Sequence, residues 1–273
     1  MKVCVTGASG RAGRAVTTDL KEHGYEVVPV DLLPSPQAPA LRADLTDYGQ
    51  AAEVLAGVDA VVHLANIPAP GLRTPAVTFN QNMTMNFNVF QAAAQAGLQR
   101  VVWASSETTL GLPFDVPPRY LPVDEDHYPV PTSTYALSKV ASETVAAQIA
   151  EWSGIPFVAL RFSNILGPAE YAEFPAVWAD PSRRKWNLWG YIDERDVALS
   201  CRLALEADVT GSQSLIIAAA DTAMNRPSAD LAAEFFPGVP VTGDITGNAT
   251  LLSIARARNV LGFTPEHSWR NHV

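Results

Sequence analysis

A tyrosine and a lysine four residues apart, Tyr135 and Lys139 in the stretch YALSK, are the first residues of this sequence that suggest chemistry. On a helix, residues four apart share a face, so both side chains can point into one pocket. A free tyrosine has a pKa near ~10, but a cation about 4 Å away at an effective dielectric of ~20 is worth ~4 kcal/mol, or ~3 pKa units. The spacing therefore predicts a phenol tuned for proton transfer.

Two serines add a second hydroxyl group to this prediction. Ser105 and Ser106 follow a strand predicted over residues 100–104, at the carboxyl end of a parallel sheet, where open α/β folds bind ligands. A hydroxyl there can hydrogen-bond the substrate oxygen on which Tyr135 acts. A simple strand end and a packing role for Tyr135 are the alternatives, but the agreement of order, element and spacing favours catalysis.

A glycine-rich loop, TGASGRAG, follows the first predicted strand and opens a helix. In that setting Gly7 permits a tight turn and Gly10 lets backbone N–H groups approach a pyrophosphate. Gly13 allows the helix to pack closely on the strand. The loop predicts a dinucleotide site, with a glycine turn that holds no ligand as the alternative.

An acidic residue at the end of the second predicted strand indicates which dinucleotide the site prefers. Asp31 lies close to where such folds place a carboxylate on the adenosine ribose, and a carboxylate there repels a 2′-phosphate. This favours NAD as the cofactor. Arg11 and Arg14 could instead pair with a 2′-phosphate, so NADP is the alternative.

Other residues complete the predicted cofactor site. Asp44 borders the adenine or, equally, caps a helix that starts near Thr46. Lys139 can hold the ribose hydroxyls beside Tyr135. We also assign to this site the residues Ser9, Arg11, Ala12, Leu45, Leu64 and Ala65.

Short β-branched segments that alternate with helical patterns indicate the elements that position these residues. Strands are predicted over residues 2–6, 26–31, 60–64, 100–104 and 157–161, and the clearest helices over 76–96 and 134–152. Gly97 and Gly154 are placed as helix caps. The alternation predicts an α/β protein with a doubly wound parallel sheet, a Rossmann fold.

The second half of the chain is expected to form a small mixed lobe. Residues 162–190 are rich in proline and contain Trp178, Trp186 and Trp189. Trp186, Trp189 and the following Tyr191 could line a sugar pocket or pack in a core or an interface. A helical pattern over 191–207 and a strand over 214–219 then return to the sheet. The predicted division is a dinucleotide domain over 1–165 that regains about 190–212, interleaved with a substrate lobe over 166–273.

Composition narrows the range of partners. The 273 residues carry a formal net charge of −9 and a pI near 5.0, which opposes binding to nucleic acid or to an anionic membrane surface. No apolar segment approaches the ~18 residues of a membrane span. Cys4 and Cys201 lie in apolar stretches without metal-ligand spacing, so we expect a reduced, cytoplasmic protein with a small-molecule substrate and no metal.

TGASGRAG, ASSETTLG, YALSK and RFSNILGP occur in this order and resemble the motifs of the NAD-dependent epimerase/dehydratase family, the extended short-chain dehydrogenases/reductases. The resemblance covers roughly residues 1–210. It implies hydride transfer between a sugar carbinol carbon and nicotinamide, with Tyr135 moving the hydroxyl proton, and a homodimer paired through the two long helices. It further selects Ser106 as the catalytic serine, Asn82 as a cofactor residue, Asn164 as a substrate residue and Asp196 as the anchor of the substrate lobe.

The substrate is less closely defined by this resemblance. The chain is also similar to uronate dehydrogenases, but Glu107 and Thr108 replace the Asn-His pair expected after the serine. Glu107 is assigned to the substrate site, with a structural salt bridge as its alternative. Arg183 and Arg184 could grip a sugar-acid carboxylate or be surface charges. The other interpretations are an NADP-linked carbonyl reductase and a non-catalytic NAD(P)-binding regulator.

Overall fold

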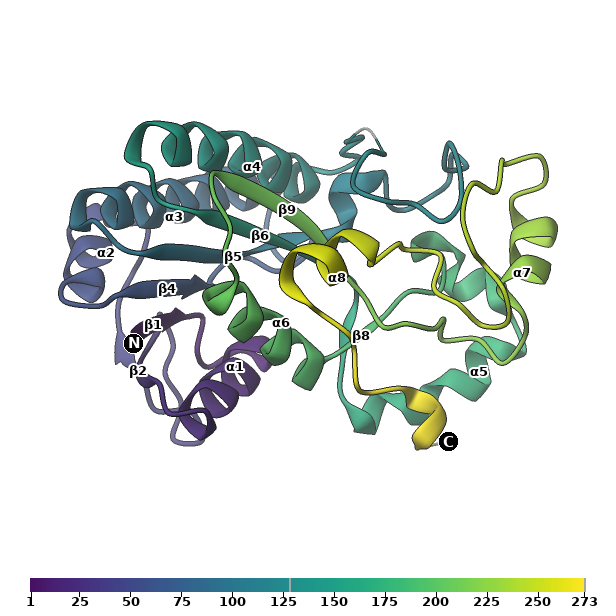
Figure 1. Cartoon of the computed structure of the whole chain (residues 1–273), viewed down its shortest axis with the longest axis horizontal. Helices are drawn as coiled ribbons and strands as arrows, with labels where there is room; N and C mark the ends of the chain where they lie inside the picture. Colours follow the sequence, from purple (N-terminus) through teal and green to yellow (C-terminus); the bar gives the residue numbers. More distant parts are fainter. Residues whose placement is uncertain (128, 273) are drawn as a thin grey trace.

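A seven-stranded sheet forms the centre of the molecule in the computed structural model, which describes residues 1–127 and 129–272 (Figure 1). Every pair of neighbouring strands is parallel, in the order β3-β2-β1-β4-β5-β6-β9. The order reverses between β1 and β4, so a crevice opens at their carboxyl ends. This confirms the predicted doubly wound fold. The strands are β1 (Lys2–Thr6), β2 (Glu26–Asp31), β3 (Leu41–Arg42), β4 (Ala60–His63), β5 (Arg100–Ser106), β6 (Phe157–Phe162) and β9 (Ser212–Ile217).

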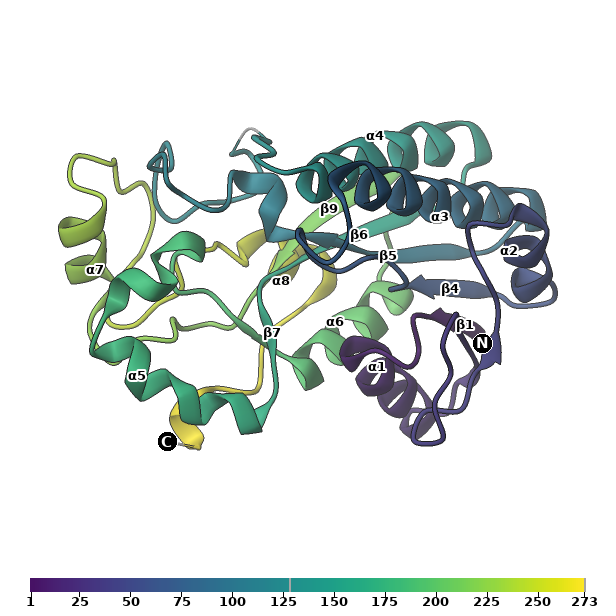
Figure 2. The same ribbon diagram turned by 180° about the vertical axis from the view of Figure 1, so that it is seen from behind.

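Helices cover both faces of the sheet, which is why β4 and β6 are buried along their whole length. One face is covered by α2 (Tyr48–Leu55), α3 (Pro75–Ala96) and α4 (Thr134–Ser153), and the other by α1 (Arg11–Glu22) and α6 (Glu194–Glu206) (Figures 1 and 2). Gly97 and Gly154 end α3 and α4 in the left-handed conformation, as predicted. Cys4 and Cys201 are fully buried in the two cores, as expected.

Strand β5, which carries both candidate serines, and its neighbour β6 are longer than predicted. β5 runs to Ser106, where Ser105 pairs with Arg161 and Ser106 with Phe162 of β6. Successive side chains on a strand point to opposite faces, so the two serines cannot share one role. Pairing with β6 maintains β5 past the predicted end, whereas the pairing of β5 with β4 stops at Trp103.

A second, mixed region lies beyond the carboxyl ends of the strands (Figure 2). Asp196 on α6 anchors its C-terminal segment, because its carboxylate accepts the backbone N–H groups of Glu266 and His267 at 3.0 Å each, which confirms the predicted anchor. The part of the chain that returns to the sheet after residue 190 ends with β9 at Ile217, beyond the predicted boundary at about residue 212. The elements of the region are β7 (Ile165–Leu166), η2 (Pro168–Glu173), α5 (Phe174–Trp178), η3 (Pro181–Asn187), β8 (Ile192–Asp193), α7 (Ser228–Phe235), α8 (Ala255–Leu261) and η4 (Trp269–Asn271).

Two of the three tryptophans pack inside this region. Trp189 is fully buried against Phe235, at 5.4 Å between ring centroids, and Trp178 stacks on Trp269 at 5.1 Å. Packing is therefore the explanation for both. Of the helices in the described parts of the chain, none has the length and apolar character needed to span a membrane.

Candidate active site

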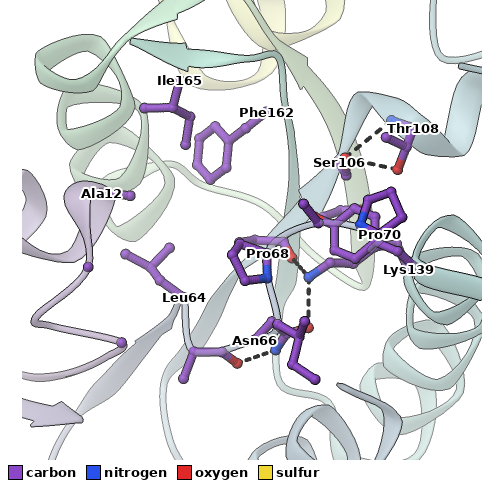
Figure 3. A pocket seen from close by; sticks show the side chains of 18 of the residues that line it. Ala12, Leu64, Asn66, Pro68, Pro70, Ser106, Thr108, Lys139, Phe162 and Ile165 are labelled. Atoms are coloured by element: carbon purple, nitrogen blue, oxygen red, sulfur yellow. Dashed lines mark hydrogen bonds between the residues drawn. The ribbon is translucent and has the colours of Figure 1, made fainter. Parts of the chain in front are cut away.

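One cavity of about 1160 Å³ runs along the carboxyl ends of β1, β4, β5 and β6. The glycine loop lines one end, and the serine, tyrosine and lysine line the other (Figure 3). The sequence-predicted residues that line it are Gly7, Ser9, Gly10, Arg11, Ala12, Gly13, Asp31, Asp44, Leu64, Ala65, Ser106, Glu107, Tyr135, Lys139 and Asn164. The structure thus brings together motifs that are more than 150 residues apart.

The glycine loop leaves no space for side chains at two positions. Gly7 has a φ of +68°, and a Cβ there would lie 2.8 Å from the backbone nitrogen of Ala65. A Cβ on Gly13 would lie 2.1 Å from the Gly7 carbonyl oxygen. Helix α1 begins directly after Gly10, so the N–H groups of its first turn and its positive dipole end meet at the loop. This cradle fits the diphosphate of a dinucleotide.

Asp31 is held at the end of β2 by the loop itself. Its carboxylate accepts the backbone N–H of Ser9 at 2.9 Å and that of Leu33 at 2.9 Å. The two basic residues of the loop have partners of their own, since Arg11 pairs with Glu170 and Arg14 donates to the Ser9 carbonyl at 2.7 Å. Neither guanidinium group is directed toward Asp31 by these contacts.

Asp44 lines the cavity but does not cap a helix. Its carboxylate accepts the backbone N–H of Thr46 at 2.9 Å and the Thr46 hydroxyl at 2.7 Å, which closes a turn. The cap of α2 is Asp47, which accepts the N–H of Gln50 at 3.0 Å. The cap interpretation of Asp44 was therefore wrong, because the helix begins two residues later than expected.

Leu45 and Asn82 face elsewhere in the described structure. The Leu45 side chain packs in the core beneath α2 and α3. Asn82 is fully buried on α3, where its side chain accepts the N–H of Ile67 at 2.8 Å and donates to the Ile67 carbonyl at 3.1 Å. Asn82 thus orders the loop after β4 that forms a wall of the cavity.

The strand pairing separates the roles of the two serines. The Ser105 hydroxyl donates to Glu143 on α4 at 2.6 Å. The Ser106 hydroxyl accepts the N–H and the hydroxyl of Thr108, at 3.2 and 3.0 Å, and remains at the cavity wall (Figure 3). Ser106 is therefore the serine placed beside Tyr135.

Lys139 is held by contacts that the sequence did not indicate. Its ammonium group lies 5.6 Å from the Tyr135 ring centroid and donates to the Asn66 side chain at 2.8 Å and to the Ala104 carbonyl at 2.7 Å (Figure 3). Asn66 in turn donates to Asn86 at 2.8 Å, and Asn86 is bonded to His63 at 3.0 Å. Polar residues in an otherwise apolar strand and helix were the only available signal.

Burial has the largest effect on the pKa values of Tyr135 and Lys139. It raises the pKa of Tyr135 to about 12, with Ser106 acting in the opposite direction and Glu107 in the same direction. Burial also lowers the pKa of Lys139 to about 7. The predicted lowering of the Tyr135 pKa by Lys139 is therefore not found, because the burial of the phenol has the larger effect and raises this pKa.

Glu107 lines the cavity beside Ser106 and is only 3% exposed. Burial raises its pKa to about 7. Its carboxylate accepts the Asn187 side chain at 3.3 Å, so it does not form the surface salt bridge considered as an alternative.

The other residues predicted on the substrate side divide into two groups. Asn164 and Trp186 line the cavity. Arg184 lies behind Asn164 and donates to the Gly190 carbonyl at 2.7 Å. Arg183 is exposed, and Tyr191 is buried and donates to Asp221 at 2.6 Å, so neither lines the pocket.

The fold and the site together define a dinucleotide-binding protein of the short-chain dehydrogenase/reductase class, with serine, tyrosine and lysine at one cavity. The model of the NAD-dependent epimerase/dehydratase family matches residues 3–212. The chain therefore belongs to this family.

Individual relatives are about a quarter identical to the chain over the residues that align. A UDP-glucose 4-epimerase of Lactobacillus helveticus is 28% identical over 178 residues, which are 61% of this chain and 52% of that protein, so the chain matches about half the length of this curated relative. An L-arabinose 1-dehydrogenase (NAD(P)(+)) of Haloferax volcanii is 27% identical, over 77% of this chain and 85% of that one. A short-chain dehydrogenase/reductase superfamily protein of Agrobacterium tumefaciens, solved with bound NAD, aligns with a TM-score of 0.77 and 25% identity over 100% and 94% of the two chains.

Proposed function

We propose that this protein is an NAD-dependent oxidoreductase that transfers hydride between nicotinamide and a secondary alcohol carbon of a sugar or sugar-like substrate. The observation that carries the proposal is the meeting of Ser106, Tyr135 and Lys139 at the cavity that the glycine loop also lines. The family and its sugar-converting relatives support it.

The proposed residue roles follow from the contacts. Ser106 hydrogen-bonds the substrate hydroxyl, and Tyr135 takes its proton as the carbon is oxidised. Lys139 stabilises the tyrosinate that accepts this proton, because an ammonium group in a water-poor site favours a nearby negative charge. When bound, NAD supplies the hydride acceptor. Gly7, Gly10 and Gly13 would hold its diphosphate, and Lys139 and Asp31 would hold its ribose hydroxyls.

NAD is preferred over NADP in this proposal because of Asp31. A carboxylate at the strand end accepts from ribose hydroxyls and repels a phosphate. Arg11 and Arg14 are engaged by Glu170 and by a backbone carbonyl, and so are not preorganised for a 2′-phosphate. The NAD bound by the Agrobacterium tumefaciens protein supports the same choice.

The test is reduction of the cofactor by a panel of free sugars, sugar acids and nucleotide sugars. We expect NADH to form with at least one member, and the Tyr135→Phe variant to lose at least about 10²-fold in kcat, the contribution of a general base, with unchanged NAD affinity. Undiminished turnover by the variant would contradict the proposal. Tight NAD binding without net reduction would instead favour an epimerase, in which hydride returns to the same molecule.

A further inference from the structure

Four buried polar atoms on the substrate side have no hydrogen-bond partner within the described chain: Glu107 Oε2, Ser163 Oγ, Asn187 Oδ1 and Arg184 Nε. Glu107 and Ser163 are each 3% exposed, and both line the cavity. Buried polar groups in folded proteins are almost always paired, so such a gathering at a cavity wall requires an explanation. A ligand that supplies the missing partners provides one.

The protein cannot easily satisfy these atoms by itself. Asn187 donates its amide hydrogens to the Glu107 carboxylate, at 3.3 Å, and to the Gly190 carbonyl, at 2.9 Å. The turn that follows places Leu188 and Trp189 at φ values of 56° and 55°, a conformation that bulky residues rarely adopt. The wall is thereby fixed. The Ser163 side chain and the Asn164 backbone both lie close enough to the Glu107 carboxyl group to lower its pKa, but neither gives Glu107 Oε2 a hydrogen bond of good geometry.

The missing partners define the ligand chemistry. Glu107 Oε2 requires a donor, and the Ser163 hydroxyl can both donate and accept. A hydroxyl group satisfies both at once, whereas a carboxylate or phosphate offers only acceptors to Glu107 and would be repelled when it is ionised. The charged and titratable groups that act on Glu107 or on which it acts are Arg184 from η3 and Tyr135 from α4.

Position along the chain links this wall to the reacting group. Glu107 directly follows Ser106, and its charge acts on Tyr135. A substrate whose reacting hydroxyl lies between Ser106 and Tyr135 can place its neighbouring carbon beside Glu107, because all three residues line the same cavity. We infer that the substrate is a vicinal diol of a sugar, in which the hydroxyl next to the reacting one donates to Glu107 and pairs with Ser163.

This inference rests on the proposed function, and its test does not require turnover. The protein, saturated with NADH, is titrated by calorimetry with glucose, galactose, the 2-deoxy and 3-deoxy forms of each, and the single 4-deoxy form that the two sugars share. A site built to hydrogen-bond a hydroxyl rejects the analogue that lacks it. We expect one deoxy position to weaken binding by about 30-fold or more in the wild type, and by less than about 3-fold in Glu107→Ala.

A second variant separates recognition from a merely structural role. In Glu107→Gln the volume is retained but the group no longer ionises. The wild-type preference for the hydroxyl should grow as pH rises through about 7, where Glu107 ionises. Lys139 also titrates near pH 7 in this cavity and is present in both proteins, so the preference of Glu107→Gln should depend less on pH than that of the wild type. Circular dichroism and the NADH affinity verify that each variant is folded.

The outcomes distinguish the inference from the proposed function. Equal effects of Glu107→Ala on all sugars and deoxy analogues, a preference in Glu107→Gln that depends on pH as strongly as in the wild type, or binding of no sugar would overturn the vicinal-diol site. Sugar binding with the expected pattern, but without NADH formation from NAD in any assay, would leave the recognition site standing and count against net oxidation. NADH formation from sugars that bind without this pattern would support net oxidation and count against the recognition site.

Discussion

At the scale of single residues, the site contains a lysine whose burial opposes its charge. Lys139 is 1% exposed, and burial lowers its pKa from 10.5 to about 7 in the folded protein. Between these values the unfolded chain binds more protons than the folded one, so the free energy of unfolding rises as pH increases from about 7 toward 10.5. The lysine is therefore retained at a cost in stability near neutral pH, as expected of a functional group.

A Lys139→Met variant removes this titration. We expect it to be more stable than the wild type by a few kcal/mol at pH 7, since each pKa unit corresponds to about 1.36 kcal/mol, with the difference shrinking by pH 10. Urea unfolding at pH 7, 8.5 and 10 measures this, with Lys21→Met, at an exposed position of α1, as the matched control. A constant difference across the three pH values would contradict the burial argument.

Asn66 is the residue through which the fold positions Lys139. In Asn66→Ala the ammonium group loses its side-chain acceptor, so we expect the Lys139 pKa to fall further and kcat/KM to decrease about 10-fold, the effect of one hydrogen bond to a charged group. Asn66→Asp places a negative charge there and should raise the pKa. With four lysines in the chain, NMR of the lysine amines resolves Lys139 directly. Identical titration in both variants would refute the role.

At the scale of elements, α4 presents three functional side chains at intervals of four residues. Tyr135 and Lys139 face the cavity. Glu143 accepts a hydrogen bond from the Ser105 hydroxyl and two from the Arg161 guanidinium group of β6, at 2.9 and 2.8 Å. The Arg161 and Glu143 side chains are only 5% and 12% exposed. This buried pair fixes the position of α4 against β5 and β6 and thus the height of Tyr135 over the sheet.

Breaking this pair on one side should be costly. Arg161→Met leaves Glu143 buried without its cation, which typically costs about 3–5 kcal/mol. The double variant Arg161→Met with Glu143→Leu removes both charges, and we expect it to recover most of that loss. Urea unfolding of the two single variants and the double variant gives the coupling energy. Losses that simply add would show that the two side chains act independently.

The elements also show which features a sequence can reveal. Helix α4 was predicted to within a residue because local signals, a helical pattern and Gly154, define its ends. The choice between Ser105 and Ser106, by contrast, depends on strand pairing with β6 and on Glu143. The contact of Asn66 with Lys139 joins residues 73 apart. No local pattern encodes such contacts, and the burial that shifts the Lys139 and Glu107 pKa values is equally a property of the whole fold.

At the scale of the whole molecule, α3 and α4 lie side by side on one face of the sheet (Figure 1). Their outer surfaces carry large apolar side chains, with Phe87 47%, Leu137 45% and Trp152 66% exposed. Scattered apolar residues are normal on a monomer, but three on one pair of adjacent helices favour an interface. We propose that two copies pair through these helices in a symmetric dimer, as expected from the family resemblance.

The dimer predicts a mass in solution of twice 29.3 kDa by light scattering. A symmetric interface presents each residue twice, so a charge placed there is buried in two copies for each dimer formed. We therefore expect Phe87→Glu with Leu137→Glu to give a folded monomer, whereas Val116→Glu, on a loop where Val116 is 79% exposed, leaves the dimer intact. Circular dichroism verifies the fold of each variant. A wild-type mass of one chain, at concentrations from micromolar upward, would rule out this assembly and require another explanation for the apolar surface of α3 and α4.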